Sequence, residues 1–203
     1  MRCKRLFDYA LAGTALVAAT PLFLLFGALI KLEDGGPVFF VQDRVGKKGK
    51  LFPCLKFRTM ILNAEAQMLH WRETNAPEWQ EYTTSNNKLV RDPRVTRVGQ
   101  VLRRTSLDEL PQLLNVLLGH MSVVGPRPLL EDELEQYGAA RVEKYGQMLP
   151  GITGLWQVSG RSNTSFEMRA EFDMQYWANR SLWQDLAILA RTVKVVLGKD
   201  GAY

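Results

Sequence analysis

Residues 9–30 read YALAGTALVAATPLFLLFGALI, a run of about 22 residues without a charged side chain. As an α-helix this run would reach about 33 Å, which is enough for the hydrocarbon core of a bilayer. A cleaved signal peptide is the alternative, because the chain starts with basic residues. The run is long for that role, however, and Leu32 continues it. The stretch therefore predicts a membrane-embedded helix at the start of the chain.

Thr20-Pro21 lies in the middle of this run and predicts a break in the helix. Proline removes a backbone donor and clashes with the preceding turn, while the threonine hydroxyl can bond a freed carbonyl. Basic residues lie on both flanks: Arg2, Lys4 and Arg5 before the run, and Lys31, Arg44, Lys47, Lys48 and Lys50 after it. Basic flanks tend to stay in the cytoplasm, so both ends of the apolar run are expected on the same side of the membrane. This favours a re-entrant helix-break-helix hairpin for residues 1–32. A straight spanning helix with a proline kink is the alternative.

The remainder, residues 33–203, is long enough for one domain with a hydrophobic core. The chain has a formal net charge of +5 and a pI of about 9.3. This excess suits an anionic partner such as nucleic acid, anionic lipid or a phosphorylated substrate, although a merely basic surface would look the same. Cys3 and Cys54 lack metal-ligand spacing and are typical of reduced thiols, which suits a cytoplasmic domain.

A basic β-hairpin is expected next, with strands at 38–41 and 51–57 around the Gly46–Gly49 turn. Lys56 and Arg58 lie at the end of its second strand. They could contact a phosphate or a lipid headgroup, or simply be solvated charges on an exposed hairpin.

The segment RRTSLDELPQ, residues 103–112, places Arg103 and Arg104 just ahead of the adjacent carboxylates of Asp108 and Glu109. Arginine binds phosphate through a planar fork of donors. A carboxylate can hold Mg²⁺ or attack as a nucleophile.

The local structure of this segment has two interpretations. Ser106 and Glu109 have the spacing of a capping box, which would make the acids ordinary first-turn residues of a helix. Pro111 disfavours helical angles at the residue before it, so the helix could instead begin at Pro111. In that case the carboxylates would lie on an irregular turn.

Farther along, residues 122–124 predict a short strand, followed by Gly125-Pro126-Arg127-Pro128. An arginine between two prolines is preorganised for a fixed ligand, or else belongs to a rigid turn. Residues 129–147 predict a charged helix interrupted near Gly138, residues 150–154 a loop and residues 155–158 another strand. The helix expected at 182–197 carries apolar residues that suit either the membrane interface or the core.

Taken together, these motifs resemble the bacterial sugar transferase family, also called monotopic phosphoglycosyl transferases or polyprenyl-phosphate hexose-1-phosphate transferases. The matching runs cover nearly the whole chain. They are the basic start with Thr20-Pro21, Gly36-Pro37-Val38-Phe39, Lys56-Phe57-Arg58-Thr59-Met60, Asp92-Pro93-Arg94, Leu107-Asp108-Glu109-Leu110-Pro111-Gln112, Gly125-Pro126-Arg127-Pro128, Pro150-Gly151-Ile152-Thr153-Gly154 and Gly160-Arg161.

The resemblance implies an enzyme at the cytoplasmic face of the bacterial inner membrane, which moves hexose-1-phosphate from a UDP-sugar to undecaprenyl phosphate and releases UMP. By the same resemblance, Asp108 forms a covalent phosphosugar intermediate, Glu109 assists, and both hold Mg²⁺. Arg103, Arg127-Pro128 and Arg161 match positions that bind the anionic substrates.

Residues 181–203 look most like undecaprenyl-phosphate galactose phosphotransferases, which favours UDP-galactose as donor. UDP-glucose or a UDP-N-acetylamino sugar is an alternative, as is a different class of protein, a catalytically silent membrane scaffold for polysaccharide assembly. Nucleic acid is not expected as a partner because it would not explain the apolar run, and the sequence leaves a homo-oligomer open. The expected fold is α+β: a mostly helical, membrane-associated domain with a small β-hairpin, interfacial helices and the re-entrant N-terminal helix.

Overall fold

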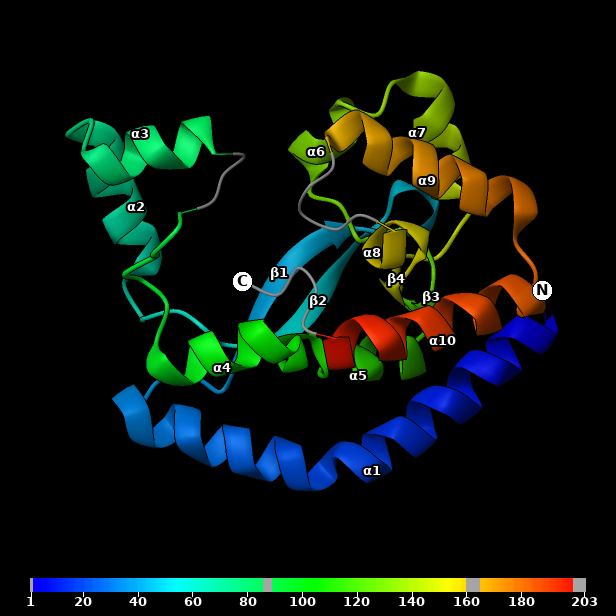
Figure 1. Ribbon diagram of the computed structural model, residues 1–203, viewed down its shortest axis with the longest axis horizontal. Coiled ribbons are helices and arrows are strands. Elements are labelled where there is room, and N and C mark those ends of the chain that lie inside the picture. The colour runs from blue at the N-terminus through cyan, green and yellow to red at the C-terminus, as the bar shows by residue number, and fades with distance from the viewer. Residues whose placement is uncertain (1, 86–88, 160–164, 199–203) are drawn as a thin grey trace.

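The computed structural model describes residues 2–85, 89–159 and 165–198, which form a mostly helical fold with two small sheets. The long helix α1 runs beneath the rest of the molecule, with α4, α5 and α10 above it (Figure 1). The α+β expectation is therefore confirmed. The elements are α1 (Arg2–Asp34), β1 (Phe39–Val45), η1 (Lys47–Gly49), β2 (Leu51–Phe57), α2 (Ala64–Glu73), α3 (Pro77–Thr84), α4 (Arg97–Thr105), η2 (Leu107–Glu109), α5 (Gln112–Leu117), β3 (Ser122–Val124), α6 (Glu131–Glu135), α7 (Ala139–Gly146), β4 (Gly151–Thr153), α8 (Leu155–Ser159), α9 (Phe166–Asn179) and α10 (Leu182–Gly198).

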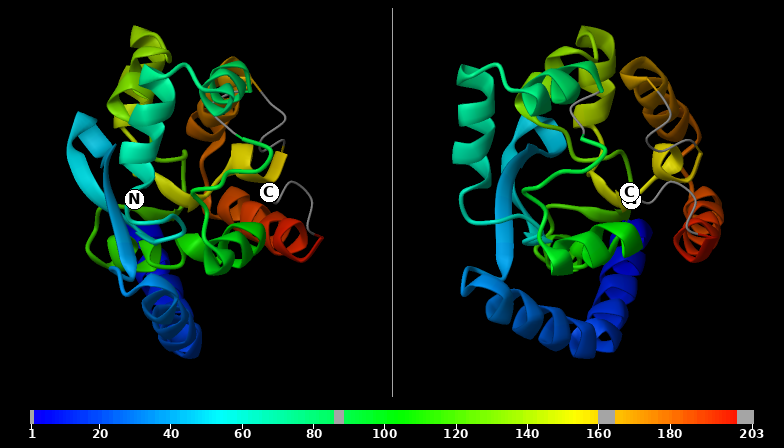
Figure 2. Two further views of the ribbon diagram at one scale, coloured as in Figure 1. Left: turned by 90° about the vertical axis from the view of Figure 1, so that its left-hand side faces the viewer. Right: turned by 60° about the vertical axis from the view of Figure 1, so that its left-hand side comes forward.

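Helix α1 contains Pro21 but continues through it, so the predicted break at Thr20-Pro21 is instead a bend within one helix. The two halves meet at a clear angle near the middle of α1 (Figures 1 and 2). The Thr20 hydroxyl donates to the carbonyl of Leu16 (3.1 Å), the normal acceptor for its own N–H. Pro21 removes only one helical hydrogen bond, and the helix absorbs that loss by bending.

By length and composition α1 could cross a membrane. One side of the helix packs against the domain through Ala12, Ala19, Phe26 and Ile30. The other side exposes large apolar residues, namely Leu6, Val17, Leu24, Leu25, Leu29 and Leu32. An exposed apolar stripe on a helix of this length is consistent with membrane association.

Polar contacts attach both ends of α1 to the same domain. Near its start, Lys4 Nζ donates to Asp185 Oδ2 of α10 (2.7 Å). Near its end, Asp34 forms an ion pair with the buried Arg58, and Glu33 accepts a backbone hydrogen bond (2.8 Å) from the first residue of α4. The whole length of α1 therefore follows one side of the domain.

The predicted hairpin is confirmed, because β1 and β2 pair antiparallel with Phe39 opposite Phe57 and Val45 opposite Leu51. Its open end rests on α1. The ring of Phe57 lies 5.1 Å from that of Phe23 and 6.3 Å from that of Phe26, measured between centroids. Since side chains alternate along a strand, the residue before Phe57 points to the opposite side of the hairpin.

The second sheet corrects two expectations. Strand β3 pairs parallel with β4 at residues 151–153, where a loop was expected, and the expected strand at 155–158 is helix α8. A Cβ on Gly151 would lie 2.1 Å from the backbone nitrogen of Gly125, and one on Gly154 would lie 2.1 Å from the carbonyl oxygen of Gly125. Two chain segments cross here at a distance that only glycine allows, which forms the sheet and turns the chain into α8.

This crossing predicts that Gly151→Ala destabilises the fold by about 3 kcal/mol, the upper range for overpacking, because the new Cβ meets backbone that cannot move aside. The free energy of unfolding in detergent measures the effect. Gly13→Ala in α1 is the matched control, since a Cβ there meets nothing within 4 Å and alanine favours a helix. Equal stability of the two variants would contradict the prediction.

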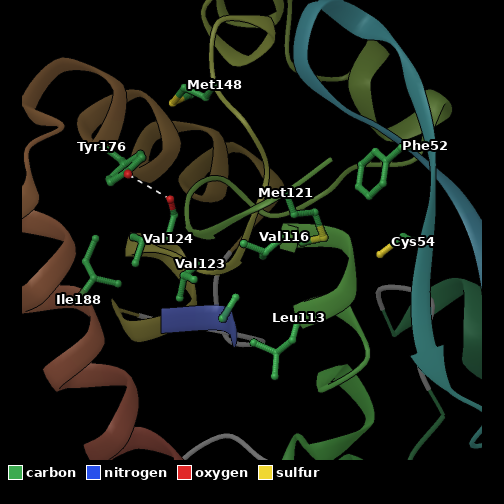
Figure 3. Packing of buried hydrophobic residues seen from close by; sticks show 11 residues of the cluster. Phe52, Cys54, Leu113, Val116, Met121, Val123, Val124, Met148, Tyr176 and Ile188 are labelled. Carbon is green, nitrogen blue, oxygen red and sulfur yellow. Dashed lines mark hydrogen bonds between the residues drawn. The ribbon is translucent and has the colours of Figure 1, made fainter. Parts of the chain in front are cut away.

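The largest core cluster lies between α1, α5, β3, α9 and α10 (Figure 3). In it, the Tyr176 hydroxyl lies within hydrogen-bond distance of the Val124 carbonyl (3.1 Å, Figure 3). The same hydroxyl is 2.7 Å from Asp185 Oδ1. Helix α10 buries Ile188 in this cluster and exposes Leu182, Trp183, Leu186 and Val193. The core alternative is confirmed for one side of this helix. The other side is apolar and exposed, so its place at the membrane interface stays a prediction.

Candidate active site

Asp108 and Glu109 lie on an irregular turn between two helices. Helix α4 ends at Thr105, Ser106 adopts a left-handed conformation (φ 56°), and the short helix η2 leads to Pro111, the N-cap of α5. Ser106 makes no capping hydrogen bond at this turn, so the capping-box interpretation was wrong. The alternative, in which a helix follows Pro111 and the acids precede it, is confirmed.

Apolar contacts fix the orientation of this turn. Leu107 and Leu110 pack against the buried cluster of Phe26, Ile30, Phe57 and Leu102. The two acids between these leucines are left partly exposed, on the side of the turn that faces the hairpin and the β3 loop. The leucines thus hold the turn without involving its carboxylates.

Cations from two other segments meet Glu109. Lys56 of β2 places Nζ 2.7 Å from Glu109 Oε1, and Arg127, in the loop after β3, places Nη1 3.4 Å from the same oxygen. The charge of Arg103 acts on Asp108, and Arg103 Nε donates to Thr59 Oγ1 (2.9 Å). The structure therefore brings together five of the residues predicted from the sequence.

The two carboxyl groups have opposite pKa shifts. Burial raises the pKa of Asp108, and the charge of Glu109 adds to this, while Lys56 and Arg103 oppose it. Burial also acts to raise the pKa of Glu109, but Lys56 and Arg127 outweigh it and lower that pKa to about 2. Adjacent carboxyls held in different environments are typical of acids with different roles in catalysis.

Arg58 and Pro128 contact other parts of the fold rather than Asp108 or Glu109. The Arg58 guanidinium bonds Asp34 and the carbonyls of Pro37 (2.7 Å) and Met60 (2.8 Å). Pro128 is buried, and its carbonyl accepts from Arg44. Arg161 lies outside the described residues. These three substrate-binding assignments stay predictions.

Sequence reasoning missed two residues that position the cations. Thr59 holds Arg103, as described above, and stands inside the run Lys56-Phe57-Arg58-Thr59-Met60, so the motif itself was a signal. The Tyr145 hydroxyl of α7 lies within hydrogen-bond distance of two carbonyl oxygens, those of Arg127 (3.2 Å) and Val45 (3.1 Å), and can donate to either. Tyr145 had no comparable signal, because its role depends on a tertiary contact.

Within the described residues, no group of three or more His, Cys, Asp and Glu side chains gathers to hold a metal ion. Asp108 and Glu109 nevertheless fit the usual magnesium site of nucleotide enzymes, where one or two carboxylates and the substrate phosphates share the ion. The pair is therefore compatible with Mg²⁺ held jointly with a bound substrate.

A carboxylate pair surrounded by lysine and arginine, on a domain attached to a long apolar helix, is typical of an enzyme that acts on phosphates at a membrane. Comparison with known proteins defines the class further. The bacterial sugar transferase family matches residues 1–199. The chain belongs to this family and is a sugar transferase, as the sequence motifs indicated.

Three relatives illustrate the similarity. The exopolysaccharide production protein ExoY of Sinorhizobium fredii is 49% identical over 200 residues, which cover 98% of this chain and 88% of that protein. The undecaprenyl-phosphate galactose phosphotransferase of Salmonella typhimurium is 48% identical over 204 residues, covering 98% of this chain and 41% of that protein. The UDP-glucose:undecaprenyl-phosphate glucose-1-phosphate transferase of Caulobacter vibrioides is 42% identical over 208 residues, covering 98% and 72%.

Proposed function

We propose that this enzyme transfers hexose-1-phosphate from a UDP-sugar, first of all UDP-galactose, to undecaprenyl phosphate, the initiating step of polysaccharide assembly. The observation that carries the proposal is the Asp108–Glu109 pair with Lys56, Arg103 and Arg127 around it. The names of the Salmonella and Caulobacter relatives, one a galactose and the other a glucose transferase, support this reaction class. UDP-glucose therefore remains the second donor to test.

The first half-reaction is a displacement at the sugar-bearing phosphorus. An oxygen of the Asp108 carboxylate attacks this phosphorus, the bond to the bridging oxygen breaks, and UMP leaves with the electron pair. Lys56, Arg103 and Arg127 offset the negative charge that accumulates on the departing phosphate. The second half-reaction reverses this geometry: an oxygen of undecaprenyl phosphate attacks the same phosphorus and releases Asp108. The product is undecaprenyl-diphosphate-hexose.

Glu109 has a different role from Asp108, because Lys56 and Arg127 both bind its Oε1. It keeps the two cations next to Asp108 while the site is empty. Asp108 and Glu109 would also hold Mg²⁺, which would neutralise charge on the diphosphate. The charges of Lys56 and Arg103 act on Asp108 from nearby and favour its carboxylate form.

The re-entrant topology is part of this proposal. Both ends of α1 are attached to one domain, and its apolar side between them is exposed. A helix that dips into one leaflet and returns explains this arrangement, whereas a straight span would separate its ends by a bilayer. Residues 1–32 then form the membrane unit, and residues 33–203 form the catalytic domain at the cytoplasmic face of the inner membrane.

Thiol labelling in oriented membrane vesicles tests this topology. Cys3 is exposed and Cys54 is buried, so a membrane-impermeant maleimide reports on Cys3 alone. In a second variant, Cys3→Ser with Leu32→Cys, the label reports on the other end of α1, where Leu32 is 83% exposed. Both positions are expected to react from the cytoplasmic side only. Reaction of the two positions from opposite sides would show a spanning helix.

The reaction itself is tested by trapping its intermediate. Detergent-solubilised enzyme is incubated with Mg²⁺ and a panel of UDP-galactose, UDP-glucose and a UDP-N-acetylamino sugar, without a lipid acceptor. Intact mass spectrometry is expected to show one added hexose-phosphate and an equal amount of released UMP. Added undecaprenyl phosphate should then remove the adduct. Absence of both adduct and UMP with every donor would contradict the proposal.

A further inference from the structure

Arg169 of α9 is a buried arginine with unused hydrogen-bond donors. Its side chain is 8% exposed, and its ion contact is Nη1 to Glu133 Oε1 at 3.4 Å. Nε and Nη2 have no hydrogen-bond partner in the part of the chain that the structure describes. Burial of a guanidinium with unpaired donors is costly unless an acceptor is supplied. Stacking on Trp156 and Phe166 offsets part of this cost, and an anionic acceptor for the two unpaired donors would offset the rest.

Trp156 of α8 connects Arg169 to the active site. The Arg169 guanidinium carbon lies 5.0 Å from the centroid of the Trp156 ring, and that of Arg127 lies 5.9 Å from the same centroid. Arg127 in turn contacts Glu109. The guanidiniums of Arg169 and Arg127 thus lie against the same aromatic ring.

Glu133 lies between two arginines. Glu133 Oε2 contacts Arg44 Nη1 at 3.4 Å, while its other oxygen contacts Arg169. Burial lowers the pKa of Arg44, and the nearby charges of Arg127 and Arg169 also lower it. One carboxylate therefore serves two largely buried arginines beside a third, an arrangement that an additional anion would stabilise.

We propose that Arg169 and Arg127 form a subsite for a phosphate monoester beside the Asp108–Glu109 pair. The inference rests on the transfer proposed above, in which two such monoesters take part: UMP leaves, and undecaprenyl phosphate arrives. The bond from UMP to the sugar-bearing phosphorus breaks, and a bond from undecaprenyl phosphate to the same phosphorus forms. The phosphate of each monoester must therefore be held next to Asp108 and Glu109. Arg169 supplies donors that the residues around Glu109 do not.

Equilibrium binding in detergent, without turnover, tests the subsite. The probes are UMP, farnesyl phosphate as a short polyprenyl phosphate, and inorganic phosphate. Arg169→Met keeps the aliphatic stem and is expected to weaken binding of at least one monoester about tenfold or more, the loss typical of a hydrogen bond to a charged group. Arg169→Lys keeps the charge and should stay within about threefold of the wild type. Loss for UMP alone assigns the subsite to the donor, loss for farnesyl phosphate alone assigns it to the acceptor, and loss for both assigns it to each in turn.

Glu133→Gln gives a test with the opposite sign. The substitution removes the carboxylate that competes with an anion for Arg169. In the wild type, Glu133 Oε2 accepts a hydrogen bond from the backbone N–H of Leu130 (2.8 Å), and the glutamine amide oxygen can still accept it. Monoester affinity should rise about threefold or more, a gain that a misfolded variant cannot produce, so the test holds even if Arg169→Met does not fold. Arg180→Met is the matched control, because Arg180 stacks on the separate ring of Trp177.

Two results would overturn the subsite: wild-type affinity of Arg169→Met for both monoesters, or unchanged affinity of Glu133→Gln. Failure of the proposed function gives a different pattern. If the wild type forms neither adduct nor UMP but binds UMP in an Arg169-dependent way, the transfer is wrong and the subsite stands. If transfer proceeds but Arg169→Met and Glu133→Gln bind both monoesters as the wild type does, the proposed function stands and the subsite is wrong.

Discussion

Replacing Asp108 by asparagine is expected to abolish the phosphosugar adduct and to reduce transfer by at least about 10⁴-fold, the loss typical of removing a catalytic nucleophile. The amide has nearly the shape of the carboxylate but cannot form the acyl-phosphate bond. The turn should keep its structure, because Leu107 and Leu110, not Asp108, hold it in place. The measurement is intact mass after incubation with the UDP-sugar, together with release of UMP.

Glu109→Gln separates the nucleophile from its neighbour. Glu109 contacts Lys56 and Arg127, whereas Asp108 has no such partner within the described chain. The glutamine variant should therefore still form the adduct, at a rate reduced about 10²-fold by the disturbed cations. If Asp108→Asn formed the adduct while Glu109→Gln did not, the two roles would be exchanged.

The sequence offered the turn at Asp108 as one of two interpretations, because the signals for it are local. Pro111 restricts the residue before it and begins the helix after it, and both effects act within a few residues. The meeting of Lys56, Arg127 and Glu109 had no such signal. These residues are brought together by the hairpin and the β3–β4 sheet. The motifs could therefore identify them as candidate site residues but could not predict their contacts.

The wrong assignment of residues 155–158 has a clear physical cause. A short apolar run fits a buried strand and a buried helix equally well. The sheet forms instead at residues 151–153, where glycine lets two backbones cross. At Thr20-Pro21 the sequence located the irregularity correctly but overstated it, because a proline in a long apolar helix can bend the helix without ending it.

Lys56→Met is expected to slow adduct formation by about 10²- to 10³-fold, since it removes a positioned cation where charge develops. It should also move the acidic limb of the pH–rate profile. The charge of Lys56 opposes the burial that raises the pKa of Asp108, so its loss raises that pKa further. Asp108 attacks only as the carboxylate, so the rate should begin to fall at a higher pH than in the wild type.

Lys50→Met distinguishes this contact from a general loss of charge. Lys50 is exposed at the turn of the same hairpin, and the two variants have the same net charge. Its rate and pH profile should match the wild type, because the charge of an exposed lysine is screened by water and salt. If both variants slowed equally, the hairpin would attract anionic substrates through its overall charge. A loss confined to Lys56→Met would show instead that its ion pair with Glu109 sets the reactivity of Asp108.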